Sequence, residues 1–84
     1  MRLSYTPPAL KALRRAPAKV AADLRAKLQI VAADPHGQHA WAKRLTDQPG
    51  YRIRQGDWRA VYRLDHKADE MIVDIIAKRD EVYK

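Results

Sequence analysis

The chain has 84 residues, which is enough for one small domain, because a chain of this length buries only about 60% of the surface that it exposes when unfolded. This length excludes a multidomain enzyme, and the absence of cysteine excludes disulfides, a thiolate nucleophile and cysteine-ligated zinc or iron–sulfur sites. Its 17 Lys and Arg residues against 10 Asp and Glu residues give a formal net charge of +7. This charge favours an anionic partner such as nucleic acid, with an acidic protein as the alternative.

The chain shows no sign of a membrane segment or a secretion signal. No apolar stretch approaches the ~20 residues that are needed to span a bilayer, and residues 1–8 lack the hydrophobic run of a signal peptide. We therefore expect a mature, soluble protein in the cytoplasm, with no membrane partner. Alanine is concentrated in residues 1–50, whereas bulky strand-forming residues are concentrated in residues 51–84. This shift predicts an α-helical half followed by a β-sheet half.

The first half predicts a short strand over residues 2–5 and then a hairpin of two helices. Thr6 is the expected N-cap of the first helix, with Pro7 and Pro8 in its first turn, where a missing N–H group does no harm. Pro17 is expected to end this helix, because a proline removes a hydrogen-bond donor and clashes with the preceding turn. The second helix places the following apolar residues on one face, at spacings of three and four: Val20, Ala21, Leu24, Leu28 and Val31.

The second half predicts an antiparallel sheet of about three further strands. Apolar and polar residues alternate from Tyr51 and again from Trp58, with a tight turn expected at residues 55–56. The nearly continuous apolar run at residues 71–76 is typical of a central, buried strand. The predicted fold class is therefore α+β: a short first strand, a two-helix hairpin and the sheet, in a single domain that spans residues 1–84.

Four arginines share one face of the predicted sheet. An even-numbered turn at residues 55–56 places Arg52 opposite Arg59, and alternation puts Arg54 and Arg63 on the same side. Like charges so close together cost stability, and only Asp57 is expected to offset them. The pattern favours a phosphate backbone as the missing counter-charge. The alternative interpretation is that these arginines are solvated strand residues.

Several segments of the second half carry a family resemblance. They are Leu45, PGYRIR at residues 49–54, GDWRAVY at residues 56–62 and the ending KRDEVY at residues 78–83. Together they resemble the RelE family of bacterial toxins, within the RelE/ParE superfamily. The preceding strand and helical hairpin match as well, so the resemblance covers nearly the whole chain and implies the RelE-like, microbial RNase-type fold.

The resemblance implies a function. Toxins of the RelE family enter the ribosomal A site and cut mRNA, with the ribose 2′-hydroxyl attacking the adjacent phosphate, and they need no metal or cofactor. The implied products carry 2′,3′-cyclic phosphate and 5′-hydroxyl ends. The chain would then be the toxin of a type II toxin-antitoxin system, a ribosome-dependent endoribonuclease that inhibits translation. Its implied partners are the ribosome, mRNA and a cognate antitoxin, with which it forms a hetero-oligomer.

The resemblance also implies site residues, position by position. Arg52 and Arg54 fall where the best-known RelE pattern has two lysines, while Arg59, Arg79 and Tyr83 fall where it has two arginines and a tyrosine. We expect these five residues to form the catalytic site. Arginine is a poor general base, so the arginines are expected to orient the phosphate and stabilise its developing charge, and no base is assigned. Further RNA contacts are expected from Lys43, Arg44, Arg63 and Lys78.

Two other functions fit the same pattern. The ParE branch of the superfamily inhibits DNA gyrase by binding, without RNA cleavage, and a non-catalytic basic RNA-binding module would bind ribosomes but leave mRNA intact. The combined ending of Arg79 and Tyr83 favours the nuclease.

The histidines and tryptophans have less specific interpretations. His36 and His39, with Asp34, could form a metal site or be exposed loop residues, and the loop interpretation is favoured because no further ligand is evident. Trp41 and Trp58 are expected to fill gaps in the core.

Overall fold

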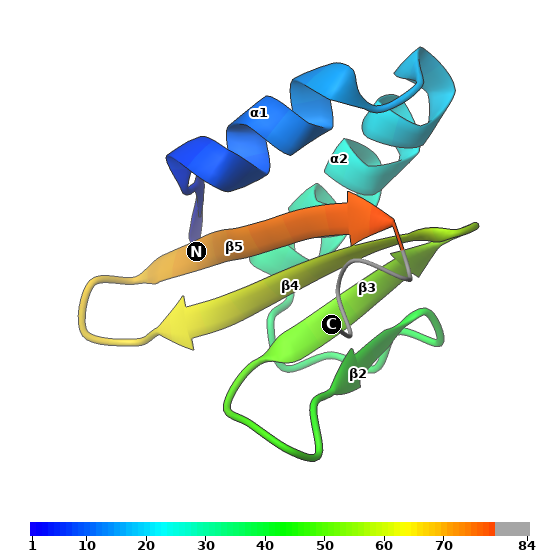
Figure 1. Cartoon of the computed structure of the whole chain (residues 1–84). Helices are drawn as coiled ribbons and strands as arrows, with labels where there is room; N and C mark the ends of the chain where they lie inside the picture. The colour runs from blue at the N-terminus through cyan, green and yellow to red at the C-terminus, as the bar shows by residue number, and fades with distance from the viewer. Residues whose placement is uncertain (79–84) are drawn as a thin grey trace.

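The computed structural model describes residues 1–78, which form two helices on one side of a five-stranded sheet (Figure 1). This arrangement confirms the predicted α+β class. The elements in chain order are β1 (Arg2–Tyr5), α1 (Pro7–Arg15), α2 (Ala18–Ala33), β2 (Ala42–Arg44), β3 (Tyr51–Gln55), β4 (Trp58–Asp65) and β5 (Glu70–Lys78).

The strand order across the sheet is β1-β5-β4-β3-β2. β1 pairs with β5 in parallel, and all other neighbours are antiparallel. The prediction that the last strand lies inside the sheet is confirmed, because β5 lies between β1 and β4, but the prediction that it is buried was wrong for one of its faces. β4 occupies the middle of the sheet, and buried and more accessible residues alternate along β5, with Ile75 44% exposed. The apolar run is therefore covered by the helices on one face only.

The helical hairpin forms as predicted. The Thr6 hydroxyl accepts a hydrogen bond from the Ala9 N–H at 3.3 Å and donates one to the Asp74 carbonyl at 2.9 Å, so the N-cap also ties α1 to β5. Pro17 lies between the helices and directly precedes α2. The N-terminal amino group of Met1 donates to the carbonyl of Ala32 at 2.9 Å, which joins the start of the chain to the end of α2.

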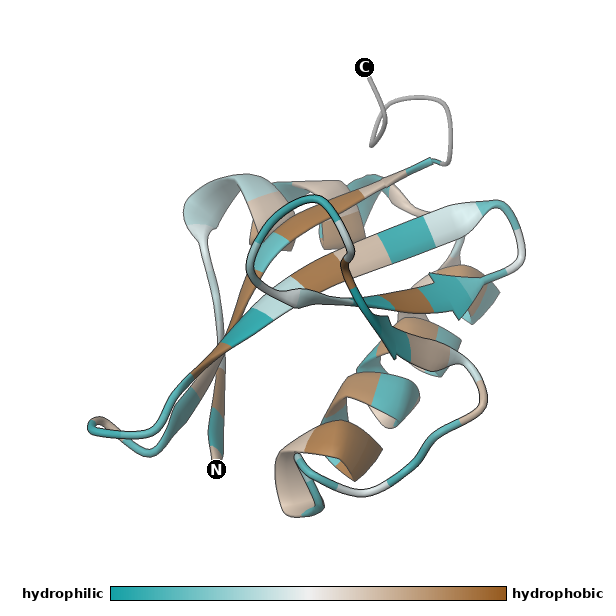
Figure 2. Ribbon diagram, turned by 90° about the horizontal axis from the view of Figure 1, so that it is seen from below, coloured by the Kyte–Doolittle hydropathy of each residue, from teal (hydrophilic) through white to brown (hydrophobic). Residues whose placement is uncertain are grey.

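The core lies between the helices and the sheet, and hydropathy alternates along the strands that bound it (Figure 2). Trp41 and Trp58 pack against this core, as predicted. Its largest fully buried side chains are Leu24, Leu28, Ile53, Met71, Val31 and Val73. The helices thus bury the face of the sheet that is opposite the arginines.

Two local features had no counterpart in the prediction. β2 is a strand of three residues within a segment that was interpreted as a loop. The loop that follows it is closed by a hydrogen bond from the Leu45 N–H to the Gly50 carbonyl at 2.9 Å. Gly50 has a φ of +114, and a Cβ atom there would lie 3.1 Å from the Tyr62 carbonyl oxygen, so this position requires glycine.

Candidate functional site

The face of the sheet away from the helices carries the predicted arginines. Ile53 and Ala60 are fully buried in the core, so their neighbours along β3 and β4 point to the opposite face. The arginines on that face are Arg52, Arg54, Arg59 and Arg63.

The turn between β3 and β4 differs from the prediction by one residue. Gln55 pairs with Trp58, so the turn consists of Gly56 and Asp57, with Gly56 at a φ of +59. The turn still has an even number of residues, and the faces are therefore as predicted. The pairing of the two strands differs from the prediction, because Arg54, rather than Arg52, lies opposite Arg59.

A cluster of unneutralised cations extends this face to the edge of the sheet. In β2, Lys43 lies opposite Arg52, while Arg54 is exposed two residues further along β3. Within the part of the chain that is described, no carboxylate forms an ion pair with any of the three. They also line, with Ala40 and Trp41, a small hollow of 70 Å³. We call Lys43, Arg52 and Arg54 the basic face; its charge suits phosphate oxygens.

Arg63 lies outside this cluster because a carboxylate neutralises it. Its Nε atom donates to the Oδ2 atom of Asp74 at 3.0 Å and to the Oδ1 atom at 3.3 Å. Asp74 is the extra residue of an irregularity in the β4–β5 pairing, between the pairs Val61–Ile75 and Tyr62–Val73. The predicted counter-charge was Asp57, whereas the structure supplies it from β5.

Arg59 is buried, with only 3% of its surface exposed. Its Nη1 atom donates to the carbonyl oxygens of Gly56 at 2.9 Å and Trp58 at 3.0 Å, which fixes the β3–β4 turn. Its Nε atom has no hydrogen-bond partner among residues 1–78. Arg59 therefore lies on the predicted face, but its guanidinium already supports the turn.

This arrangement predicts a stability effect. Arg59→Met should lower the free energy of unfolding by about 2 kcal/mol, because two charge-assisted hydrogen bonds to the turn are lost. Urea denaturation followed by circular dichroism measures the change, with Lys11→Met, on the exposed face of α1, as the control. An unchanged or increased stability would mean that the cost of desolvating the guanidinium exceeds these hydrogen bonds.

The other predicted site residues are distributed differently. Arg44 pairs with Tyr51 and lies on the helix side of the sheet, not on the basic face. Lys78 is exposed and lies opposite Trp58, also away from that face. Arg79 and Tyr83 lie outside the described residues.

The histidines form stacked pairs. His36 stacks on His66 with ring centroids 5.1 Å apart, and His39 stacks on Trp41 at 5.1 Å. Among residues 1–78, no three His, Cys, Asp or Glu side chains gather as a metal site would need. The stacking of His36 on His66 joins loops that are distant in the sequence, so no local signal could have indicated it.

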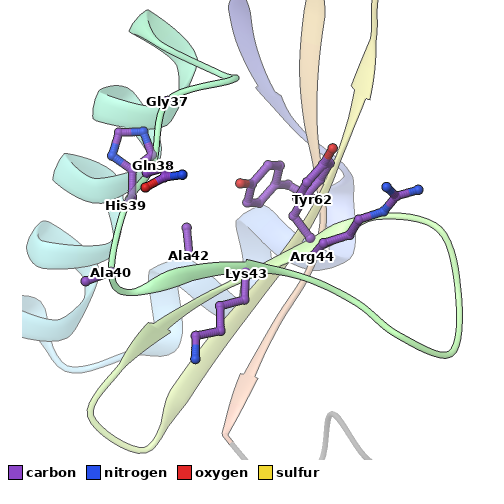
Figure 3. Close-up of a pocket in the computed structure, with 9 residues that line it drawn as sticks. Gly37, Gln38, His39, Ala40, Ala42, Lys43, Arg44 and Tyr62 are labelled. Carbon is purple, nitrogen blue, oxygen red and sulfur yellow. The ribbon is translucent and has the colours of Figure 1, made fainter.

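A larger hollow, of 540 Å³, lies on the helix side of the sheet and was not foreseen (Figure 3). Tyr51 and Tyr62 line it, with their ring centroids 5.3 Å apart. Burial, and secondarily the neighbouring Tyr51, raises the pKa of Tyr62 to about 12. The Tyr62 hydroxyl therefore keeps its proton, and its ability to donate a hydrogen bond, to a higher pH than an ordinary tyrosine does.

The raised pKa of Tyr62 predicts a loss of stability at high pH. Unfolded tyrosine ionises near pH 10, whereas Tyr62 in the folded chain ionises near pH 12, so stability is complete below pH 10 and is lost as the pH rises toward 12. A plot of unfolding free energy against pH should fall by up to about 1.4 kcal/mol per unit in this window for one proton. Tyr62→Phe should remove that slope; an unchanged slope would assign it to other groups, such as Tyr5, whose pKa burial also raises.

Comparison with known families decides the classification. The profile described as the ParE toxin of type II toxin-antitoxin system, parDE, matches residues 3–83. The chain belongs to this toxin family. Neither helix among residues 1–78 of this ParE-family member has the length and apolar composition of a membrane-spanning helix. No curated protein matches the chain by sequence.

Solved structures place the ParE-family chain in the wider RelE/ParE superfamily, as the sequence predicted. The isolated E. coli RelE toxin is 28% identical, with a TM-score of 0.80 over 98% of this chain and 89% of that one. RelE in the intact E. coli RelBE toxin-antitoxin complex is 26% identical, with a TM-score of 0.78 over 92% of this chain and 94% of that one. A YoeB/ParE toxin from Agrobacterium tumefaciens, at 18% identity, shares the fold with a TM-score of 0.78 over 93% and 98% of the two chains.

Proposed function

We propose that this toxin is a ribosome-dependent endoribonuclease, which cleaves mRNA in the ribosomal A site and thereby inhibits translation. The observation that carries the proposal is the basic face: Lys43, Arg52 and Arg54 converge on one side of the sheet with no carboxylate paired to them in the described part of the chain. The similarity to E. coli RelE, at 28% identity over 98% of this chain, supports the same function.

The proposed chemistry is the attack of a ribose 2′-hydroxyl on the adjacent phosphate. The bond between the 2′-oxygen and phosphorus forms while the bond to the 5′-oxygen of the next nucleotide breaks, which leaves a 2′,3′-cyclic phosphate and a 5′-hydroxyl. Guanidinium groups suit this reaction, because they bind two phosphate oxygens at once and stabilise the charge that grows on them. Arg52 and Arg54 are the described residues placed for this role, and Arg79 and Tyr83 complete the proposed site.

Proton transfer is the step that the basic face serves least well. Arg52 and Arg54 stand where the RelE pattern has lysines, and a guanidinium keeps its proton far more firmly than an ammonium group does. We infer that water or the ribosome accepts the proton of the 2′-hydroxyl and supplies the proton that the departing 5′-oxygen takes up. The proposed role of these arginines is therefore electrostatic, and the rate should depend more on their charge than on their acidity.

The proposed regulation follows from the family. A cognate antitoxin is expected to hold the toxin inactive in a hetero-oligomer in the cytoplasm until the antitoxin is degraded. The net charge of +7 favours an acidic antitoxin segment that folds as it binds. Several structurally similar chains come from toxin-antitoxin complexes, among them the RelE-RelB complex from Pyrococcus horikoshii.

A second candidate function is inhibition of DNA gyrase. Two observations favour it: the matching family profile is that of ParE, and the guanidinium of Arg59 is occupied by turn carbonyls rather than free for phosphate. In this case the basic face would contact an acidic protein surface or DNA, and no phosphodiester bond would be cut.

One pair of assays separates the two candidates. Primer extension on mRNA in purified translating ribosomes, without metal beyond what ribosomes need, should show cuts at A-site codons, and the new ends should be 2′,3′-cyclic phosphates. Intact mRNA together with inhibited supercoiling by gyrase would replace the nuclease with the gyrase inhibitor. Intact mRNA, normal supercoiling and salt-dependent ribosome binding would leave only a non-catalytic RNA-binding module.

A further inference from the structure

The 540 Å³ hollow exists because the helices do not cover the whole sheet. α2 ends at Ala33, and residues 37–40 pass to one side of the sheet before β2 begins. β2, β3 and β4 therefore have helix-side residues without a helix above them. The loop forms one wall of the hollow and the strands form the opposite wall (Figure 3).

The strand wall is a row of three residues across neighbouring strands. Arg44 of β2 pairs with Tyr51 of β3, which pairs with Tyr62 of β4. The tyrosine rings are nearly parallel, with an interplanar angle of 14°. Tyr62 is 3% exposed, and its ring stacks on the ring of Tyr51. The half-buried Tyr51 ring is therefore held in place and forms an aromatic surface. Such a ring is a platform on which a nucleobase can stack.

The polar groups around this surface are mainly donors. Arg44 lines the hollow, and within the described residues it is not paired with a carboxylate. Lys43 borders the hollow, but its side chain points to the opposite face of the sheet (Figure 3). His39 and Gln38 line it from the loop, and Gln38 offers an amide that can bond to the edge of a base. None of the residues that line the hollow is acidic. The site is therefore suited to an anionic ligand that also has a flat aromatic part.

We propose that this hollow binds one nucleotide of single-stranded RNA, with the phosphate at Arg44 and the base against Tyr51. The volume lies within the range of about 300–1,000 Å³ that is usual for small-molecule sites. A single carboxylate side chain of an acidic protein would fill little of this space and would leave the tyrosine surface unused. The chemistry of the lining thus favours a nucleotide over an acidic peptide.

The inference deepens the proposed function, on which its biological role rests. Lys43 borders this hollow, and its side chain belongs to the basic face on the other side of the sheet. It lies on β2, which is an edge strand, so RNA that passes over this edge can contact both sites. The hollow would then hold a nucleotide next to the segment that the basic face binds.

NMR titration of the ¹⁵N-labelled full chain with 5′-AMP, without ribosomes, tests the inference. The amides of residues 37–44, Tyr51 and Tyr62 should shift, whereas adenosine and inorganic phosphate, each with half of the contacts, should bind more weakly. Arg44→Ala should weaken 5′-AMP binding about tenfold, the effect of one charge-assisted hydrogen bond. Lys11→Ala removes a cation that is also exposed, from α1, and should leave binding unchanged. Circular dichroism checks the folding of both variants.

Other outcomes would overturn the inference. Equal weakening by Arg44→Ala and Lys11→Ala, or equal binding of phosphate and 5′-AMP, would reduce the interaction to non-specific charge attraction. Shifts of these amides with a glutamate-rich peptide but not with 5′-AMP would identify a protein-binding site instead. If the chain cuts mRNA in ribosomes but its amides do not shift with 5′-AMP, only this inference is wrong. If the chain binds 5′-AMP but leaves mRNA intact, only the proposed nuclease activity is wrong.

Discussion

The double substitution Arg52→Ala/Arg54→Ala is expected to slow mRNA cleavage in translating ribosomes by about 10³-fold, because loss of even one well-placed donor to a developing oxyanion costs about 10² to 10³ in rate. Both side chains belong to the basic face, and no carboxylate among residues 1–78 forms an ion pair with them. Neither residue belongs to the hydrophobic core. Primer extension in a single-turnover time course measures the rate.

Two comparisons make this result specific. Lys11→Ala/Arg15→Ala removes the same charge from the exposed face of α1 and should change the rate less than about threefold. Arg52→Lys/Arg54→Lys keeps the charge and restores the residue types of the RelE pattern, so it should cut at least as fast as the unaltered chain. An alanine variant that still cuts at the normal rate would remove the basic face from the mechanism.

The substitution Leu28→Ala is expected to lower the free energy of unfolding by about 3 kcal/mol, the usual cost of truncating a fully buried leucine. Leu28 has no exposed surface and belongs to the cluster that joins α2 to the sheet. Small domains have only about 5–15 kcal/mol of stability in total, so this is a large share. Urea denaturation, analysed with a two-state transition, measures the loss.

Ile30→Ala is the matched control, because Ile30 lies on the same helix and is 49% exposed. It should change stability by no more than about 0.5 kcal/mol, as is usual at the surface. If both variants lost the same stability, the effect would come from the helix itself, and the packing of α2 on the sheet would not be what holds the fold together.

The sequence could predict those parts of the fold that depend on local patterns. Thr6 and the prolines after it define the start of α1, and the spacing of Val20 to Val31 defines the buried face of α2. The alternation from Tyr51 gave the correct faces of β3 and β4, even though the turn is shifted by one residue. Moving a two-residue turn by one position shifts the pairing of the two strands by two residues, and a shift of two leaves every side chain on its predicted face.

Features that depend on contacts between distant residues could not be predicted. Three-residue β2 exists only through its pairing with β3, and Asp74 becomes the partner of Arg63 only through an irregularity in the β4–β5 pairing. Asp23 and Lys27 are four residues apart on α2, a spacing that favours an ion pair, but the pair does not form. Asp23 pairs with Lys19 at 3.9 Å, while Lys27 donates to the Arg54 carbonyl at 2.8 Å.

For the candidate site, the sequence could indicate which arginines share a face of the sheet, but not how each side chain is held. The positions of Arg52 and Arg54 on one face followed from alternation, and the family resemblance gave them a role. The folding of Arg59 back onto the turn carbonyls depends on the rotamer of one side chain, which no pattern of residue types specifies. Whether Arg59 acts on RNA therefore remains a prediction, as do the roles of Arg79 and Tyr83.

The parallel pairing of β1 with β5 has a consequence for the time course of synthesis. Arg2 to Tyr5 pair with Glu70 to Val73, so the first strand to be synthesised has its partner in the last. β1 cannot join the sheet until β5 has emerged from the ribosome, and contacts of such long sequence separation form slowly. A nascent toxin therefore lacks a complete sheet until β5 has emerged, which gives an antitoxin time to bind it before it matures.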